Sequence, residues 1–478
     1  MNYRMISHTL GSVLACLAVL MLLPLAAGLC YGENVLGFVV AVVITAAVSF
    51  FLRSFKPRST DIYAREGFVI VGLAWISMSL LGALPFVISG QIPNYIDAVF
   101  ETVSGFTTTG ASILTDIEGM SHGCLFWRSF THWIGGMGVL VFVMAVLPMS
   151  GEHSMHIMRA EVPGPTVGKL VPRARETAKI LYLMYMALTA LETIFLKAGG
   201  MSFFDALLHA FGTAGTGGFS TKAASVGAFN SLYVEMVISV FMLLFSVNFN
   251  LYYLLLIGRV KDVLKNEELR WFLAIVLFSV LTIAVNISSM YGSFTTALRH
   301  AFFNVSTIIS TTGFGTVDFN LWPQYSKWLL ILLMFIGACA GSTGGGLKVS
   351  RVVMLLKSAE AELKKMIRPR SVTRVQLEGK RVETGAVHAV NTFFVMYLMI
   401  LLVCTLLISV DGFDMETNFT GALACLSNIG PGMSLVGPTG SYSMFSSFSK
   451  IILSLAMLIG RLEIYPILLL FSRHTWKR

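Results

Sequence analysis

The 478 residues are 55% hydrophobic and only 12% charged, a composition that is typical of helices crossing a lipid bilayer and unlike that of a soluble domain. The net charge of +9 does not indicate nucleic-acid binding, because the basic residues lie in short loops between apolar runs without interleaved aromatic residues. The six cysteines are far apart and the nine histidines lack ligand spacing such as HExxH, so neither a disulfide framework nor a metal centre is predicted.

About ten apolar runs are long enough to cross a bilayer, so the sequence predicts a multi-pass membrane protein. In chain order they lie at residues 10–29, 35–52, 67–89, 124–148, 179–198, 231–257, 270–289, 325–356, 385–410 and 444–470. The first run is itself of spanning length and another follows soon after, so we expect a retained helix rather than a cleaved signal peptide. Most Lys and Arg residues fall in alternate loops, which predicts that both termini are cytoplasmic. We expect a multi-pass protein of the cytoplasmic (inner) membrane.

A half-length apolar segment ending in Thr, Ser, Asn and Gly recurs four times on the outer side, between the two spans of successive pairs. The segments occupy residues 95–112, 203–221, 294–316 and 413–433, and we align them on Gly110, Gly217, Gly313 and Gly430. This pattern predicts an all-α membrane protein with four helix/pore-helix/helix repeats in a pseudo-fourfold arrangement around one pore. The predicted parts are two N-terminal transmembrane helices (1–62), repeat 1 (63–150), a cytoplasmic loop (151–178), repeat 2 (179–262), repeat 3 (263–356), a basic cytoplasmic loop (357–384) and repeat 4 (385–478).

The ends of the four half-helices have the chemistry of a cation filter. Irregular backbone at membrane depth must be buried in protein or line a wet cavity, because unsatisfied carbonyl groups are costly in hydrocarbon. The C-terminal end of a helix carries partial negative charge, and glycine lets successive carbonyls point inward to replace the hydration shell of an ion. We therefore predict ion binding at Thr108, Thr109, Gly110, Gly215, Thr216, Gly217, Thr311, Thr312, Gly313, Asn428, Ile429 and Gly430. The alternative is that these glycines only pack helices closely, as in small-xxx-small crossings.

The eighth run is too long for one crossing and is interrupted at Gly341, Ser342, Thr343, Gly344, Gly345 and Gly346. Three consecutive glycines disfavour a helix, each by about 1 kcal/mol relative to alanine. A nucleotide-binding loop is not predicted, because the GxxxxGK[ST] spacing is absent and no strand precedes the segment. We expect either a flexible constriction beneath the filter or a kink that only accommodates packing.

Arg461 lies within the last run, where a charged side chain costs at least about 2.5 to 3.5 kcal/mol unless it finds a partner or water. We expect it to face the bundle interior and to bind bare carbonyls of the loop at 341–346, as the latch of a gate that also includes Lys348. The alternative is a structural ion pair with Glu463, although residues two apart on one helix do not face each other.

Nearly the whole chain resembles the TrkH type of the Trk, Ktr and HKT superfamily of potassium transporters. The resemblance rests on the filter segments, the two extra N-terminal spans, RAEVPGP at 159–165, GACAGSTGGGLK at 337–348 and GRLEIY at 460–465. The GTG of repeat two and the NIGPG of repeat four depart from many TrkH sequences but leave the backbone argument intact. The resemblance implies potassium at the filter residues, since glycine at all four positions accompanies potassium preference. It also implies a homodimer, a TrkA-like nucleotide-binding regulatory subunit and an arginine that helps to hold the intramembrane loop closed.

These features together predict passive or weakly coupled potassium uptake by a chain that is not an enzyme and binds no nucleotide itself. The basic loop at 357–381 fits either docking of an acidic or nucleotide-loaded regulator or a topology signal that faces lipid. A sodium- or proton-coupled cation symporter with the same fold is the alternative function. A membrane-embedded enzyme would need clustered catalytic residues, and the spans hold only scattered candidates such as Glu192, His132 and Asn248.

Overall fold

The computed structural model describes residues 1–55, 63–138, 174–369 and 375–476, and almost all of its regular structure is helical. The helices are α1 (Tyr3–Leu20), α2 (Leu22–Cys30), α3 (Leu36–Ser54), α4 (Ala64–Gly82), α5 (Leu84–Ile88), α6 (Tyr95–Phe106), α7 (His122–Gly136), α10 (Ala174–Ala198), α11 (Phe203–Gly215), α12 (Leu232–Phe245), α13 (Phe249–Leu256), α14 (Val260–Lys265), α15 (Glu267–Tyr291), α16 (Phe294–Ile309), α17 (Gln324–Ile336), α18 (Val349–Ile367), α19 (Thr384–Ile408), α20 (Met415–Leu426), α21 (Ser447–Arg461), α22 (Tyr465–Phe471) and α23 (Arg473–Trp476). Short 3-10 helices lie at Ser225–Phe229, Phe319–Leu321, Ser409–Asp411, Ser434–Val436 and Tyr442–Met444. The strands β1 (Gln376–Leu377) and β2 (Lys380–Arg381) form a small antiparallel hairpin.

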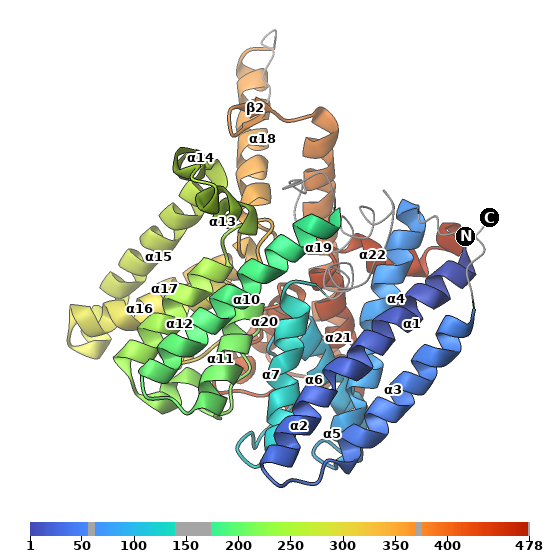
Figure 1. Ribbon diagram of the computed structural model, residues 1–478. Coiled ribbons are helices and arrows are strands. Elements are labelled where there is room, and N and C mark those ends of the chain that lie inside the picture. The colour runs from blue at the N-terminus through green and yellow to red at the C-terminus, as the bar shows by residue number, and fades with distance from the viewer. Residues whose placement is uncertain (56–62, 139–173, 370–374, 477–478) are drawn as a thin grey trace.

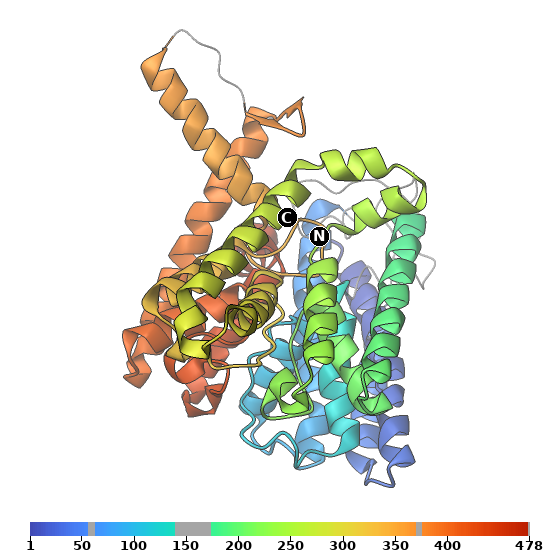
Figure 2. The ribbon, with the colours of Figure 1, turned by 90° about the vertical axis from the view of Figure 1, so that its left-hand side faces the viewer.

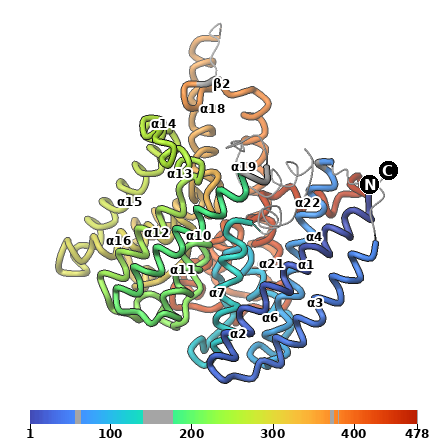
Figure 3. Tube along the Cα trace, viewed as in Figure 1, coloured from blue at the N-terminus to red at the C-terminus, as the bar shows by residue number. Residues whose placement is uncertain are grey.

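The helices form one bundle, with α1 and α3 side by side along one edge and the two termini near each other at one end (Figures 1 and 3). At that same end α18 projects beyond the other helices, beside the β1–β2 hairpin (Figures 1 and 2). The predicted basic loop at 357–384 therefore begins as a helix, because α18 continues to Ile367.

Four short helices, α6, α11, α16 and α20, correspond to the four predicted half-helices. Asn94, Ser202 and Asp414 precede three of them, and the side chain of each accepts a hydrogen bond from a backbone N–H of the first turn. Such caps satisfy N–H groups that a helix start leaves without a partner. The final turns of all four helices are buried, so their C-terminal ends lie inside the bundle.

Six helical segments in the described part of the chain are long and apolar enough to cross a membrane. They are Tyr3–Cys30, Leu36–Ser54, Arg65–Ile88, Thr177–Ala198, Glu267–Tyr291 and Thr384–Asp411, and they match the first, second, third, fifth, seventh and ninth predicted runs. The two N-terminal spans and the first span of every repeat are therefore continuous.

The second span of every repeat is shorter or broken. In repeat one, α7 ends at Gly136, and residues 139–148 of the predicted span lie outside the described residues. In repeat two, α12 and α13 meet at a bend of 92°. In repeat three, the chain leaves α17 at Ile336 and re-enters a helix only at Val349, and in repeat four α21 and α22 are separated by residues 462–464.

Candidate functional site

The four half-helices end in the same backbone conformation. The backbone is left-handed at Thr108, Thr216, Thr311 and Asn428, with φ between 53° and 59°. Two residues later a left-handed glycine follows, at Gly110, Gly218, Gly313 and Gly430, with φ between 80° and 95°. The residue between them donates its backbone N–H to the carbonyl five positions earlier, at 2.8 to 2.9 Å in all four repeats. Four segments of different sequence therefore have one local fold.

The second repeat is shifted by one residue from our sequence alignment. We aligned it on Gly217, but Gly218 has the left-handed φ, and Thr216 and Gly217 match the first two residues of the other triplets. Gly215 lies one position before the triplet, where its carbonyl accepts a hydrogen bond from the Thr216 hydroxyl at 2.6 Å. Glycines at positions 215, 217 and 218 made the two registers indistinguishable by residue type.

The four triplets close a ring in chain order. A Cβ added to Gly110 would overlap the carbonyl oxygen of Gly217, one on Gly218 that of Thr312, one on Gly313 that of Ile429, and one on Gly430 that of Thr109. Each glycine therefore lies directly against the backbone of the next repeat, and the fourth repeat meets the first. The four segments converge on one axis, with the partly negative C-terminal ends of their half-helices directed toward it.

Side-chain hydroxyl and amide groups stabilise this ring through hydrogen bonds. The hydroxyls of Thr107 and Thr109 are 2.8 Å apart, and those of Ser310 and Thr312 are 2.7 Å apart. The Asn428 amide Nδ2 donates to the Thr109 hydroxyl at 3.0 Å and to the Met457 carbonyl at 2.9 Å. Within the described residues, Thr108 Oγ1 and Asn428 Oδ1 are buried without a hydrogen-bond partner in the protein.

A cavity of ≈ 280 Å³ opens at the ring. Its lining includes all four left-handed glycines and residues shortly after each of them, and the charged side chains among the described lining residues are Arg128 and Lys222. The ring is therefore accessible from one side.

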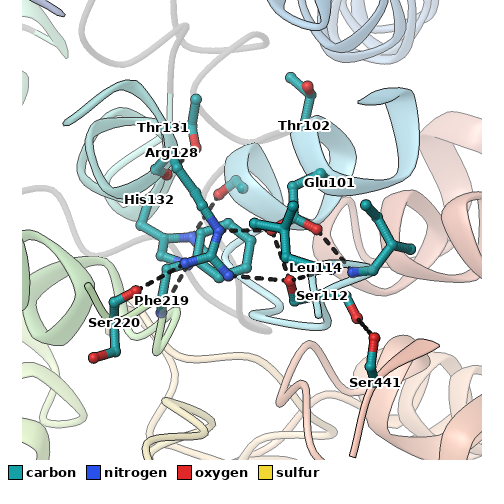
Figure 4. Close-up of polar contacts among 12 residues, drawn as sticks. Glu101, Thr102, Ser112, Leu114, Arg128, Thr131, His132, Phe219, Ser220 and Ser441 are labelled. Atoms are coloured by element: carbon teal, nitrogen blue, oxygen red, sulfur yellow. Dashed lines mark hydrogen bonds and ion pairs between the residues drawn. The ribbon is translucent and has the colours of Figure 1, made fainter. Parts of the chain in front are cut away.

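A buried ion pair on α6 and α7 holds the chain where it leaves the first two triplets (Figure 4). Arg128 Nε lies 2.6 Å from Glu101 Oε1, and the two side chains are 2% and 0% exposed. The same guanidinium donates to the Ser220 carbonyl at 3.0 Å and lies 3.6 Å from the centre of the Phe219 ring, while the Glu101 carboxylate accepts the backbone N–H of Ile113 at 3.0 Å. Our sequence analysis missed this pair, although two charged residues in apolar segments were a visible signal.

His132 on α7 lies between the first and second triplets. Its Nδ1 is 2.7 Å from the Gly105 carbonyl, and its Nε2 accepts the backbone N–H of Phe219 at 3.2 Å. Both ring nitrogens are thus engaged with backbone groups, which suits a neutral ring that positions these two segments rather than a catalytic base.

The glycine-rich loop between α17 and α18 lies directly beneath the ring. The Gly345 N–H donates to the Thr311 hydroxyl at 2.6 Å, and a Cβ on Gly344 would come within 2.8 Å of the Ser310 carbonyl oxygen. The loop is seated in the bend between α12 and α13: the Thr343 N–H donates to the Phe245 carbonyl at 3.3 Å, and the Phe249 N–H donates to the Gly341 carbonyl at 3.0 Å. Backbone groups that lack a helical partner at the breaks in two repeats therefore form hydrogen bonds with each other.

Comparisons with known proteins identify this architecture. A family model described as "TrkH: Cation transport protein" matches residues 32–477. The chain is 37% identical to the "Trk system potassium uptake protein TrkH" of Salmonella typhimurium and 36% identical to that of Escherichia coli K12, each over 100% of both chains. The chain belongs to the TrkH family. A crystal structure titled as the potassium transporter TrkH from Vibrio parahaemolyticus superposes with a TM-score of 0.90 at 34% identity, covering 100% of both chains.

Two of the three further motifs of this TrkH-family chain lie together in the structure. The segment GACAGSTGGGLK at 337–348 forms the loop beneath the ring, and GRLEIY at 460–465 includes the break at residues 462–464 between α21 and α22. The motif RAEVPGP at 159–165 lies outside the described residues.

Arg461 connects three repeats of the TrkH-family bundle. Its guanidinium donates to the Thr343 carbonyl of the loop at 2.7 Å and to the Gly135 and Gly136 carbonyls at the end of α7 at 2.6 and 2.7 Å. Glu463 instead pairs with Arg351 on α18, 3.2 Å from its Nη1. The structure therefore places Arg461 on loop carbonyls and gives Glu463 a different partner.

The remaining gate candidates of the TrkH-family loop contact one another. Lys348 is 2% exposed, is left-handed at φ 78°, and its ammonium group donates to the Gly344 carbonyl. The Ser342 hydroxyl donates to the Cys339 carbonyl at 2.6 Å, and a Cβ on Gly346 would lie 2.8 Å from the Gly337 Cα. The loop is thus closely packed and carries a buried lysine just below the ring.

Glu268, in the first turn of α15, holds both ends of the TrkH-family loop and was missed by our sequence analysis. Its Oε1 accepts the backbone N–H of Ala340 at 2.7 Å and that of Ser350 at 3.0 Å. The neighbouring Glu267 pairs with Lys357 on α18 and accepts the Glu378 N–H at 3.0 Å in the β1–β2 hairpin. The sequence alone did not indicate this role, because acidic residues are common in the first turn of a helix.

Proposed function

We propose that this chain carries potassium ions into the cell through the ring of four backbone triplets. The observation that supports this most is the closure of the ring, since carbonyl groups of all four repeats lie around one axis that opens into a cavity. Backbone carbonyls in that arrangement replace the water around an alkali cation. The names of the full-length relatives point to the same ion.

The filter residues of this proposal are Thr108, Thr109, Gly110, Thr216, Gly217, Gly218, Thr311, Thr312, Gly313, Asn428, Ile429 and Gly430, with Gly215 just before the second triplet. Glycine is required at the third position for two reasons: the backbone is left-handed, and a side chain would overlap the next repeat. Close-packing glycines would instead lie within helices, in ordinary helical conformation.

In this proposal the loop at 341–346 is the gate, with Lys348 and Arg461. The loop lies across the inner end of the ring, and the ammonium group of Lys348 beneath it opposes a cation that leaves the filter. Arg461 holds the loop closed through the Thr343 carbonyl. Ion passage then requires this segment, rather than the filter, to move.

The direction of transport follows from the proposed orientation, with both termini and α18 in the cytoplasm and the ring mouth outside. A membrane potential supplies about 2.3 kcal/mol per charge per 100 mV, which drives cations inward without an enzymatic step. The "Trk system" in the names of relatives denotes a system rather than a single protein. We assign to this chain the membrane subunit, as a homodimer that binds a nucleotide-loaded cytoplasmic regulator at its basic α18 side.

The proposal is tested by rubidium and sodium fluxes in liposomes that contain the purified chain. Wild-type protein should pass rubidium down its gradient in preference to sodium. Gly110→Ser and Gly218→Ser should each lower rubidium flux about tenfold and weaken the preference, because the added side chain would overlap a carbonyl oxygen of the next repeat and displace it from the axis.

The matched control is Gly412→Ser, since Gly412 is also left-handed, at φ 78°, but an added Cβ meets nothing within 4 Å. An unchanged ion preference in both filter variants would overturn the filter assignment. Flux that requires an inward sodium or proton gradient would show the coupled symporter instead.

A further inference from the structure

The α1–α3 hairpin carries a groove that the transport pathway does not use. The groove lies between the two helices, from His8 and Arg53 at one end to Leu22 and Val42 at the other, with a volume of ≈ 910 Å³. In the figures both helices lie at the edge of the bundle, far from the half-helices α11, α16 and α20 (Figure 1). The volume is in the range of sites that bind small molecules.

The groove has one cationic end and an otherwise apolar wall. Its lining is mainly Ala, Val, Leu and Phe, and no acidic side chain is among the described residues that line it. His8 and Arg53 lie together at the end nearest the N-terminus, where His8 Nδ1 is 3.3 Å from the Arg53 carbonyl oxygen. This distribution of groups is complementary to an amphiphile that has a negative head group and a hydrocarbon tail.

The position of Arg53 is fixed by close packing of the two helices. The Ser49 hydroxyl donates to the Gly11 carbonyl at 2.6 Å, and a Cβ added to Gly11 would lie 2.6 Å from Arg53 Cγ. The aliphatic part of Arg53 therefore lies across Gly11, which lets its guanidinium remain exposed at the groove end. In the part of the chain that the structure describes, no carboxylate pairs with this guanidinium.

The length of the groove fits one leaflet. Residues 8 and 22 are separated by about 21 Å along a helix axis at 1.5 Å per residue. Half of a hydrocarbon core about 30 Å thick is about 15 Å, so an acyl chain that starts at Arg53 can follow the groove to the middle of the bilayer. The small side chains of Ala15, Ala18 and Ala46 leave the space that the acyl chain would fill.

We propose that the α1–α3 groove binds an anionic phospholipid, with its phosphate group at Arg53 and His8 and one acyl chain between α1 and α3. A basic side chain near the membrane surface attracts anionic lipid by about 1 kcal/mol. The groove thereby gives the two N-terminal helices a lipid-binding role that is separate from the ion pathway.

Native mass spectrometry of the purified, delipidated full chain tests this proposal, with phosphatidylglycerol and phosphatidylcholine of identical acyl chains as probes. Wild-type protein should bind the first phosphatidylglycerol about fivefold more tightly than the first phosphatidylcholine, which corresponds to about 1 kcal/mol. Arg53→Gln should abolish that ratio, and Arg53→Lys should retain most of it. Arg270→Gln is the matched control, because Arg270 is an exposed arginine near the end of another span and does not line the groove.

A second variant separates the groove from the charge. Ala46→Phe should weaken binding of both lipids, because it fills the groove and leaves Arg53 in place. Equal binding of the two lipids by wild-type protein, or equal loss in Arg53→Gln and Arg270→Gln, would overturn the proposal. Unchanged lipid binding by Ala46→Phe would overturn the placement of the acyl chain, and a groove covered by a second copy of this chain would give that same result.

Discussion

The ring of four triplets is held in place by a buried charge pair as well as by glycine. Glu101 and Arg128 are nearly inaccessible, yet together they bind the backbone at Ile113 and Ser220, just after the first and second triplets. Taking two charges out of water is costly, and the pair regains this cost only while both partners and their backbone contacts are present. A small displacement of either repeat would break these contacts and leave a buried charge without its partners, which is energetically costly.

Removal of one member of this pair should destabilise the protein strongly. Arg128→Met leaves the Glu101 carboxylate buried without its cation, so we expect the free energy of unfolding to fall by about 3–5 kcal/mol. Thermal unfolding in detergent measures the change as a lower apparent Tm. Arg259→Met is the control, because the Arg259–Asp262 pair is 61% and 44% exposed and such pairs contribute only about 0–1 kcal/mol.

The double variant Glu101→Gln with Arg128→Met completes this test. It removes both charges and should recover part of the stability lost in Arg128→Met. An apparent Tm of Arg128→Met equal to that of Arg259→Met would show that the buried pair has no such role.

At the residue scale, sequence predicted which residue types end the four half-helices but not the register of the second triplet. The left-handed positions fall on Thr or Asn and on Gly, which are the residue types that were predicted at the ends of the half-helices. In repeat two, however, several glycines stand together, and only the backbone identifies Gly218 as the equivalent of Gly110. Residue type fixes what a position tolerates, whereas the register depends on neighbours that are distant in sequence.

At the scale of helices, the breaks in the second spans belong together. The loop after α17 donates N–H groups to carbonyls at the end of α12, and Arg461 at the end of α21 donates to carbonyls of the same loop and of α7. Backbone groups freed by one break are therefore satisfied by another, as membrane depth requires. Sequence predicted the break in the eighth run from its glycines, but the bend at Ser246–Asn248 has neither glycine nor proline and was not predicted.

The loop should open more readily when either of its side-chain anchors is removed. Glu268→Ala eliminates the acceptor of the Ala340 and Ser350 N–H groups, and Arg461→Ala eliminates the donor to Thr343. Hydrogen bonds to charged groups contribute about 1.5–3 kcal/mol, so rubidium flux in liposomes should rise about tenfold or more in each variant.

Two controls make this result specific to the hydrogen bonds. Both N–H groups reach the same oxygen of Glu268, so Glu268→Gln keeps an acceptor in place and should have a flux close to that of the wild type. Glu362→Ala changes an exposed carboxylate on α18 and should also have little effect. A flux that stays at the wild-type level in both Glu268→Ala and Arg461→Ala would remove the gate assignment from the loop.

At the scale of the whole molecule, the N-terminal hairpin is attached to the first repeat through Glu33, in the turn between α2 and α3. The carboxylate accepts the backbone N–H groups of His122 at 2.6 Å and Gly123 at 3.0 Å, at the start of α7, and Tyr31 stacks on the His122 ring at 3.8 Å. Sequence predicted the two extra helices and the four repeats, because each is a local pattern. It did not predict this attachment, which joins residues about ninety positions apart by ordinary polar groups.

This attachment makes the stability of the protein depend on pH. Burial raises the pKa of Glu33, but hydrogen bonds from the Gly123 and His122 N–H groups and from the His122 ring outweigh it and leave the pKa below its ordinary value of 4.5. A lowered folded-state pKa contributes stability that is present above 4.5 and is lost as the pH falls through that lowered pKa. Glu33→Gln should therefore lower the apparent Tm by a few degrees at neutral pH, with a difference from the wild type that narrows in acid. Glu118→Gln, which changes an exposed carboxylate in the neighbouring loop, should show no such trend. A Tm difference for Glu33→Gln that is independent of pH would mean that the ionised carboxylate does not attach the hairpin.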